Sequence, residues 1–160
     1  MNILYLHDEN ELISNSHHST LQKYCIENGY ELHTPNINYT TLSVDVPQIE
    51  EQIYDRNEWL VIGSGLGGWL AYIFSREHQT KCVLINPEIE PKGFKPLVVN
   101  NLSPTLILLD SADEVIDSHN SYRMFENYAQ VEIFDGGDHR FQHMQESMIY
   151  IDEMVNHVHL

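Results

Sequence analysis

An aspartate and a histidine in this sequence have the types and the spacing that proton-transfer chemistry requires. Asp113 follows closely after the apolar run "TLILL", and His139 follows closely after "VEIF". A histidine can move a proton to or from a reacting group, and a carboxylate can hold the required tautomer and stabilise the charged ring. We therefore interpret Asp113 and His139 as a candidate catalytic acid–histidine pair.

A glycine stands where such a pair needs a nucleophile. The stretch "VIGSGLGGWLAYIF" reads as a strand, a sharp turn and a helix, which is the layout of a nucleophile elbow with the reactive residue between two glycines. With Gly63 and Gly67 in the glycine places, Gly65 takes the nucleophile position. The nearest serine, Ser64, comes one position early, so its hydroxyl should miss His139. We expect serine-type hydrolysis to be weak or absent.

Apolar runs alternate with helical patterns along the chain, and these elements must position the candidate site. We expect strands at 2–6, 30–34, 59–63, 81–86, 105–110 and 131–134, and helices at 16–28, 47–56, 66–78, 118–129 and from about 142 onward. Repeated strand–helix units with nearly continuous apolar strands indicate an α/β fold, with a mostly parallel sheet and helices on both faces. Ser118 is expected to cap its helix. One domain over residues 1–160 suffices.

Ligands bind at the carboxyl ends of the strands in an open parallel sheet. Gly65, Asp113 and His139 fall at such ends in the order nucleophile, acid, histidine, which is the chain order of an α/β-hydrolase triad. The irregular stretch from Pro87 to Pro104 holds four of the six prolines, and it is expected to be a surface excursion that covers a pocket.

Five blocks of the sequence, in order, resemble those of the YqiA/YcfP-type family of small bacterial α/β-hydrolase-fold proteins, which are candidate esterases. The blocks are "ILYLHDEN", "IGSGLGGWLA", "VLINP", "LLDSADEVIDS" and "DGGDHRF". The resemblance implies a minimal α/β-hydrolase fold with a very short cap and a small ester or thioester substrate. Asp113 and His139 match the family's acid and histidine. The elbow is more similar to the YcfP-like branch, which also reads G-x-G-L-G-G, than to the YqiA-like G-S-S-L-G-G.

The first loop also departs from the family, which usually reads H-G where this chain reads His7-Asp8-Glu9. Backbone N–H groups of that loop and of Leu66 would form the oxyanion hole. Two carboxylates beside a developing oxyanion oppose it, unless they point to solvent. Our main hypothesis is therefore a degenerate hydrolase kept as a binding or regulatory protein, with a small ester or acyl ligand.

Two alternatives remain open. An active esterase or thioesterase could use Ser64 or a water activated by His139. A nucleotide-binding protein could use Gly63, Gly65 and Gly68 as G-x-G-x-x-G, with Glu88 as the ribose-binding acid.

Acidic residues outnumber basic ones by 24 to 8, for a net charge of −16. Such a charge should repel nucleic acid and anionic membranes, and the acids are too scattered to favour a nucleic-acid mimic. The apolar run at the start of the chain is too short for a signal peptide, and Cys25 and Cys82 are expected to be reduced, which favours a cytoplasmic protein. No cofactor is expected. Three histidine pairs lack completing metal ligands: His17–His18, His139–His143 and His157–His159.

Overall fold

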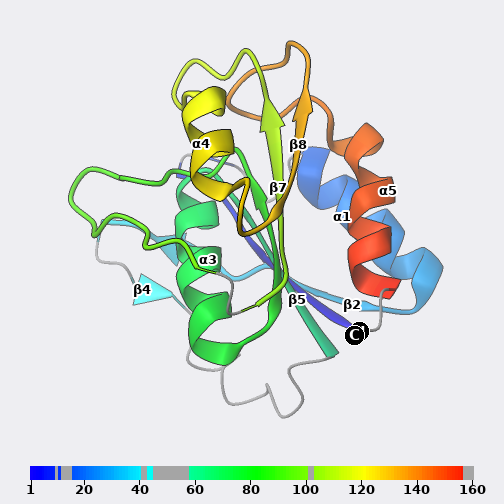
Figure 1. The fold of residues 1–160 in the computed structure, drawn as a ribbon. Helices are drawn as coiled ribbons and strands as arrows, with labels where there is room; N and C mark the ends of the chain where they lie inside the picture. Colours follow the sequence, from blue (N-terminus) through cyan, green and yellow to red (C-terminus); the bar gives the residue numbers. More distant parts are fainter. Residues whose placement is uncertain (10, 12–15, 41–42, 45–57, 101–102, 157–160) are drawn as a thin grey trace.

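A six-stranded sheet forms the centre of the computed structural model, which describes residues 1–160 except 10, 12–15, 41–42, 45–57, 101–102 and 157–160. The strands are β1 (Asn2–Leu6), β2 (Glu31–His33), β5 (Trp59–Ser64), β6 (Lys81–Ile85), β7 (Thr105–Asp110) and β8 (Gln130–Phe134). Their spatial order is β2-β1-β5-β6-β7-β8, and every neighbouring pair is parallel (Figure 1). Separately, β3 (Ile37–Asn38) and β4 (Ser43–Val44) form a short antiparallel pair. The predicted parallel sheet is confirmed.

Helices cover both faces of this sheet (Figure 1). The helices α1 (Ser16–Asn28) and α5 (Met144–Asn156) lie on one face, and α3 (Leu66–His78) and α4 (Ser118–Phe125) lie on the other. The predicted bounds of α1 and α3 are confirmed, whereas α5 begins two residues later than expected. The helix expected at 47–56 lies outside the described residues.

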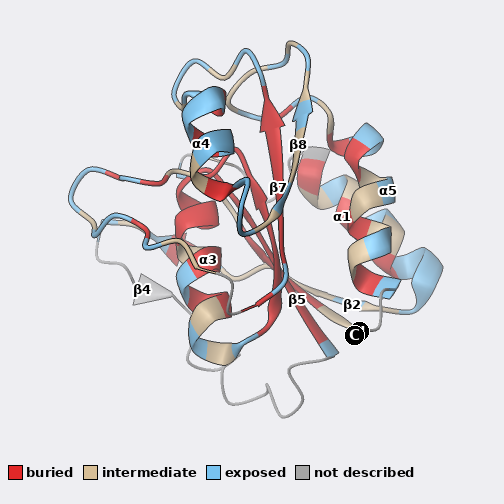
Figure 2. Cartoon of the chain, viewed as in Figure 1, coloured by how far each residue is buried: buried red, intermediate tan, exposed pale blue. Residues whose placement is uncertain are grey.

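The core has two halves, one on each side of the sheet. Because successive strand residues point to opposite faces, Val61 lies in the half beneath α3 and α4, and Ile62 lies in the half beneath α1 and α5. All residues of β5, β6 and β7 are buried, as their unbroken apolar runs require (Figure 2). The edge strand β8 remains partly exposed. Gly65 and Asp113 therefore follow the carboxyl ends of fully buried strands.

The N-terminus of α4 differs from the prediction. Asp117, not Ser118, is the capping residue, because its side chain accepts hydrogen bonds from the backbone N–H groups of His119 and Asn120. Ser118 is instead the first helical residue and is buried.

The connection between β6 and β7 contains no helix or strand in its described residues, 87–100 and 103–104. It packs on α3: the Trp69 indole N–H donates to the Lys95 carbonyl at 2.8 Å, and the Trp69 ring lies 4.8 Å from that of Phe94. The fold therefore has the expected very short cap. No described helix is long and apolar enough to cross a membrane. That residues 1–160 form one domain stays a prediction.

Candidate active site

The turn between β5 and α3 has the sharp geometry of a nucleophile elbow. Gly65 has φ 57° and ψ −119°, a backbone conformation that L-residues rarely adopt. A Cβ atom at Gly63 would lie 2.1 Å from the Gly67 carbonyl oxygen, and one at Gly67 would lie 2.1 Å from the Leu6 carbonyl oxygen. These two glycines therefore let the helix begin directly against the strands.

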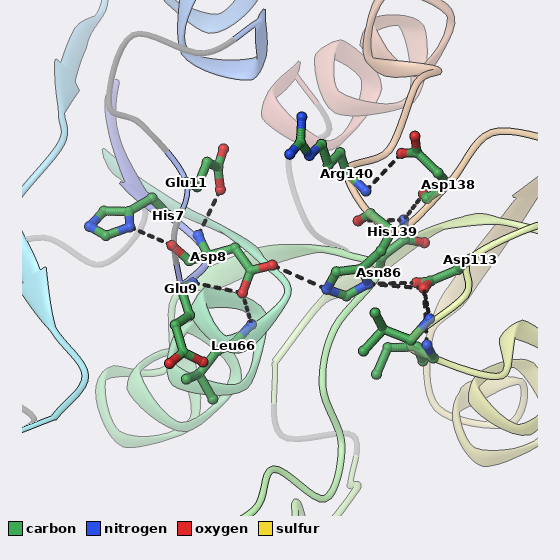
Figure 3. Close-up of polar contacts among 12 residues, drawn as sticks. His7, Asp8, Glu9, Glu11, Leu66, Asn86, Asp113, Asp138, His139 and Arg140 are labelled. Carbon is green, nitrogen blue, oxygen red and sulfur yellow. Dashed lines mark hydrogen bonds and ion pairs between the residues drawn. The ribbon is translucent and has the colours of Figure 1, made fainter.

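The structure brings Asp113 and His139 together at the ends of β7 and β8 (Figure 3). The Nδ1 atom of His139 lies 3.0 Å and 2.9 Å from the two carboxylate oxygens of Asp113. Asp113 Oδ1 also accepts the backbone N–H groups of Val115 and Ile116, at 2.8 and 2.9 Å. The histidine backbone N–H donates to Glu114 at 3.0 Å. These backbone contacts hold the Asp113 carboxylate in place, so that it can orient the imidazole ring of His139.

The Asp8 carboxylate lies between the imidazole of His139 and the backbone of Leu66 (Figure 3). Its Oδ2 lies 3.1 Å from His139 Nε2, and its Oδ1 accepts the backbone N–H groups of Leu66 and Glu9, both at 2.8 Å. A Cβ atom added to Gly65 would lie 2.2 Å from Asp8 Cγ. The carboxylate therefore fills the space of a serine side chain at position 65 and engages the Leu66 amide expected in the oxyanion hole.

The two carboxylates hold His139 in its charged form. Each ring nitrogen faces an acceptor that has no proton to give, so both nitrogens donate. Burial lowers the pKa of His139, but the hydrogen bonds and charges of Asp113 and Asp8 outweigh it and raise the pKa to about 10. At neutral pH the ring therefore has no lone pair with which to accept a proton.

Hydrogen bonds from neighbouring residues hold the loop that carries Asp8 in place. The His7 Nδ1–H donates to the Asp8 carbonyl at 2.7 Å, and His7 Nε2 accepts the Ile37 N–H at 3.1 Å. The Asp8 N–H donates to Glu11 at 2.7 Å. Glu9 is exposed and points away from the imidazole (Figure 3). Of the two carboxylates expected in this loop, only Asp8 enters the site.

Ser64 lies on the other side of the elbow. As the last residue of β5 it follows the alternation of Ile62, which faces α1 and α5, and it is buried. Its hydroxyl hydrogen-bonds with Tyr5, whose own pKa is raised well above the usual value by burial and by Glu11. The structure thus places Ser64 against Tyr5 and places Asp8 against His139.

Two residues that the sequence analysis missed hold the histidine loop. Asp110, wholly buried at the end of β7, accepts the N–H groups of Asp138 and Gln142 at 3.2 and 2.8 Å. Asn86, after β6, donates to the carbonyls of Asp138 and His139 at 3.0 and 3.2 Å. Each is a polar residue directly at the end of an apolar strand, and this signal could have identified both.

The glycine turn has no free amide for a phosphate at its first helical residue. The Leu66 N–H, which a bound phosphate would need, already donates to Asp8. Glu88 lies beside the turn, where its N–H donates to the Gly65 carbonyl at 3.0 Å. Burial and the charge of Asp8 raise the pKa of Glu88. This acidic setting disfavours a nucleotide.

The described histidines of the three candidate metal pairs have other partners. His17 contacts Glu11 and the Phe141 carbonyl, at 3.5 and 2.9 Å, while His143 contacts Asp110 at 2.6 Å. In the part of the chain that the structure describes, no group of three or more His, Cys, Asp or Glu side chains is arranged so that it could hold a metal ion. His157 and His159 lie outside that part.

Comparison with solved structures shows the fold. A candidate hydrolase of the alpha/beta superfamily from Xanthomonas campestris pv. campestris superposes with a TM-score of 0.76 at 18% identity, over 96% of each chain. An α/β serine hydrolase without a lid, also from Xanthomonas campestris, gives 0.74 at 14% identity, over 96% of this chain and 80% of that one. Est1E from Butyrivibrio proteoclasticus gives 0.71 at 12%, over 98% and 88%. The chain therefore has an α/β-hydrolase-like fold.

A comparison of the sequence with known proteins and family models shows to which family the chain belongs. No curated protein matches the chain. The model of an uncharacterised protein family, UPF0227, matches residues 2–96 and 92–156, which together span nearly the whole sequence. This is the YqiA/YcfP-type family that the sequence blocks resemble, and its YcfP-like branch stays a prediction. On this match, the chain belongs to the UPF0227 family.

Proposed function

We propose that this α/β-hydrolase-family protein is a weak or inactive serine-type hydrolase that keeps its acid–histidine pair and binds a small ester or acyl ligand. The carboxylate of Asp8, held by His139 Nε2 at 3.1 Å and the Leu66 N–H at 2.8 Å, carries the proposal. This carboxylate fills the space of a nucleophile side chain at position 65, and it occupies the Leu66 N–H that would otherwise donate to an oxyanion. Catalysis of acyl transfer needs these two positions to be open.

The same contact argues against the alternatives that use Ser64 or an activated water. A general base must have a free lone pair, and the Nε2 of His139 is occupied by its hydrogen bond to Asp8. Ser64 faces Tyr5 on the opposite side of the elbow. Attack by either group would require Asp8 to leave the site first.

Labelling with a fluorophosphonate, which reports an activated serine, tests the proposal. The wild type should stay unlabelled. Gly65→Ser should also stay unlabelled, because its Cβ would collide with Asp8 at 2.2 Å. The double variant Asp8→Gly, Gly65→Ser removes the carboxylate and supplies the hydroxyl, so we expect labelling that rises by roughly 10³-fold or more over wild type.

Two controls complete this experiment. His139→Gln in the double variant should abolish its labelling, and thermal melting should show that each protein is folded. Labelling of the wild type that disappears in Ser64→Ala would overturn the proposal, because Ser64 would then be a working nucleophile. A folded double variant without labelling would contradict the retained acid–histidine frame.

A further inference from the structure

We propose that Asp8 is itself a nucleophile, and that the site hydrolyses a neutral alkyl compound with a good leaving group through a covalent alkyl ester on Asp8. The inference rests on one part of the proposed function, namely that Asp8 stands in the serine's place. It goes beyond that function by assigning an activity to a different class of substrate. Carboxylates are established nucleophiles in enzymes that form covalent intermediates.

The two oxygens of Asp8 have different surroundings, which suits them to different tasks. Oδ1 accepts two backbone N–H groups, from Leu66 and Glu9, and is fixed by them. Oδ2 has one contact, the imidazole of His139 at 3.1 Å. The side chains of Asp8 and His139 are 18% and 13% exposed, so the ion pair remains in partial contact with solvent. Oδ2 is therefore the attacking atom.

The chemistry of a carboxylate selects a saturated carbon rather than an acyl carbon. Attack on an ester carbonyl gives a tetrahedral intermediate that expels the carboxylate again, since an alkoxide is a much stronger base. Direct displacement at saturated carbon has no such intermediate, and a halide leaves readily. Because the His139 hydrogen bond also withdraws electron density from Oδ2, the leaving group must be a good one, such as bromide.

In the first step a bond forms between Oδ2 and the alkyl carbon while the carbon–halogen bond breaks, and the halide leaves with the bonding electrons. Asp8 becomes a neutral ester and loses its hydrogen bond to His139. The imidazolium is then stabilised by Asp113 alone, and it releases its Nε2 proton to solvent. The histidine thus becomes a base only after the substrate has bound covalently.

In the second step His139 Nε2 takes a proton from a water molecule whose oxygen bonds to Asp8 Cγ. The negative charge develops on Oδ1, where the Leu66 and Glu9 N–H groups already point, at 2.8 Å. The Cγ–Oδ2 bond then breaks, and the alcohol leaves with Oδ2 and the proton from His139. The net reaction converts the alkyl halide and water into the alcohol, the halide and one proton.

Charge around the site favours an uncharged substrate. The carboxylates of Glu88 and Glu114 lie beside the ion group, and the chain carries a net charge of −16. A haloacid anion would be repelled by this field, whereas a neutral alkyl bromide would not. 1-Bromobutane is therefore a suitable probe.

The test follows a single turnover of the folded wild type with 1-bromobutane in ¹⁸O-labelled water. We expect bromide release, and we expect the ¹⁸O to appear in the Asp8 carboxylate of the digested protein, because the alcohol takes the old Oδ2. His139→Gln should keep the first step and lose the second, so a butyl ester should accumulate on the peptide that carries Asp8. Asp8→Asn should lower bromide release by about 10⁴-fold or more.

The matched control is Glu90→Gln, an exposed carboxylate outside the site, which should release bromide like the wild type. Unlabelled Asp8 in the wild type, together with no butyl ester in His139→Gln, would overturn the inference. Equal alkylation of Asp8 and of surface carboxylates such as Glu90 would also overturn it, as chemistry without a site. Neither result depends on fluorophosphonate labelling, so failure of this inference can be distinguished from failure of the proposed function.

Discussion

At the scale of single residues, the site is defined by one histidine between two carboxylates. In a serine hydrolase the Nε2 of the histidine faces a hydroxyl that can give it a proton. Here it faces Asp8, which can only accept one. While Asp8 is ionised, the imidazole therefore forms an ion group with Asp113 and Asp8. Two residues therefore distinguish this site from that of a serine hydrolase: Gly65 in the elbow and Asp8 in the first loop.

The ion group should make stability depend on pH. The pKa of His139 rises from 6.5 to about 10 on folding, so its stabilising effect is complete below about pH 6.5 and is lost as the pH rises through about 10. We expect the free energy of unfolding, measured in urea, to fall across this range in the wild type. The fall should be smaller in His139→Gln.

The comparison of the two proteins isolates His139 from other groups. His17, whose pKa is raised by Glu11 and the Phe141 carbonyl against the effect of burial, titrates in both of them. Parallel pH profiles of wild type and His139→Gln would show that His139 is not a buried imidazolium. A histidine ring resonance that titrates near pH 10 in the wild type would confirm the assignment.

At the scale of elements, the ends of the central strands hold the histidine loop. Asn86 and Asp110 follow the buried runs of β6 and β7, and together they hold backbone groups of Asp138, His139 and Gln142. A Cβ atom at Gly137 would lie 1.7 Å from Asp110 Oδ2, which explains why the loop has glycine there. The loop is therefore fixed by the sheet itself.

Replacing Asp110 with Asn should loosen this loop. The change removes the buried charge that accepts two backbone N–H groups and contacts His143, so we expect a loss of about 1–3 kcal/mol in the free energy of unfolding. The NMR resonances of the His139 ring should shift as well. Chemical denaturation with NMR measures both effects.

The matched control is Asp135→Asn, an exposed aspartate after β8 that lies 3.4 Å from the Ser111 hydroxyl. Its free energy of unfolding should change by less than about 0.5 kcal/mol. Equal losses in Asp110→Asn and Asp135→Asn would show that the charge of the chain, and not the position of Asp110, is responsible.

At the scale of the whole molecule, charge is the dominant feature. With 24 acidic and 8 basic residues, the compact state brings many like charges close together. Pairs such as Lys23–Glu27, at 3.9 Å, are exposed and contribute little. At the site itself, the carboxylates of Asp8 and Glu88 interact with each other, and their negative charges oppose anionic ligands.

Salt should therefore stabilise the protein. Raising sodium chloride from about 0.01 to 0.15 M shortens the screening length from about 30 to 8 Å, which weakens the repulsion between surface carboxylates. We expect the melting temperature to rise over this range, as followed by circular dichroism. A melting temperature that falls with salt would mean that attraction between surface charges outweighs their repulsion.

The fold and the pairing of Asp113 with His139 could both be predicted from the amino-acid sequence. Continuous apolar runs can only be buried on both faces, which requires a parallel sheet with helices on each side. Asp113 and His139 follow neighbouring strands of that sheet, so their meeting was predictable. The capping residue of α4 was harder to predict. Aspartate and serine are both favoured at the N-cap, and the backbone conformation in the folded chain places Asp117, not Ser118, in that position.

The position of the Asp8 side chain, in contrast, depends on contacts that exist only in the folded chain. From the sequence its side chain could point to solvent or into the site, because loop residues are free of the alternation that strands impose. The missing Cβ of Gly65 leaves a space that the Asp8 carboxylate fills, and the Leu66 N–H and His139 hold it there. Those partners lie 58 and 131 residues away in the chain. No local sequence pattern specifies such distant contacts, so the position of the Asp8 carboxylate could not be predicted from the sequence.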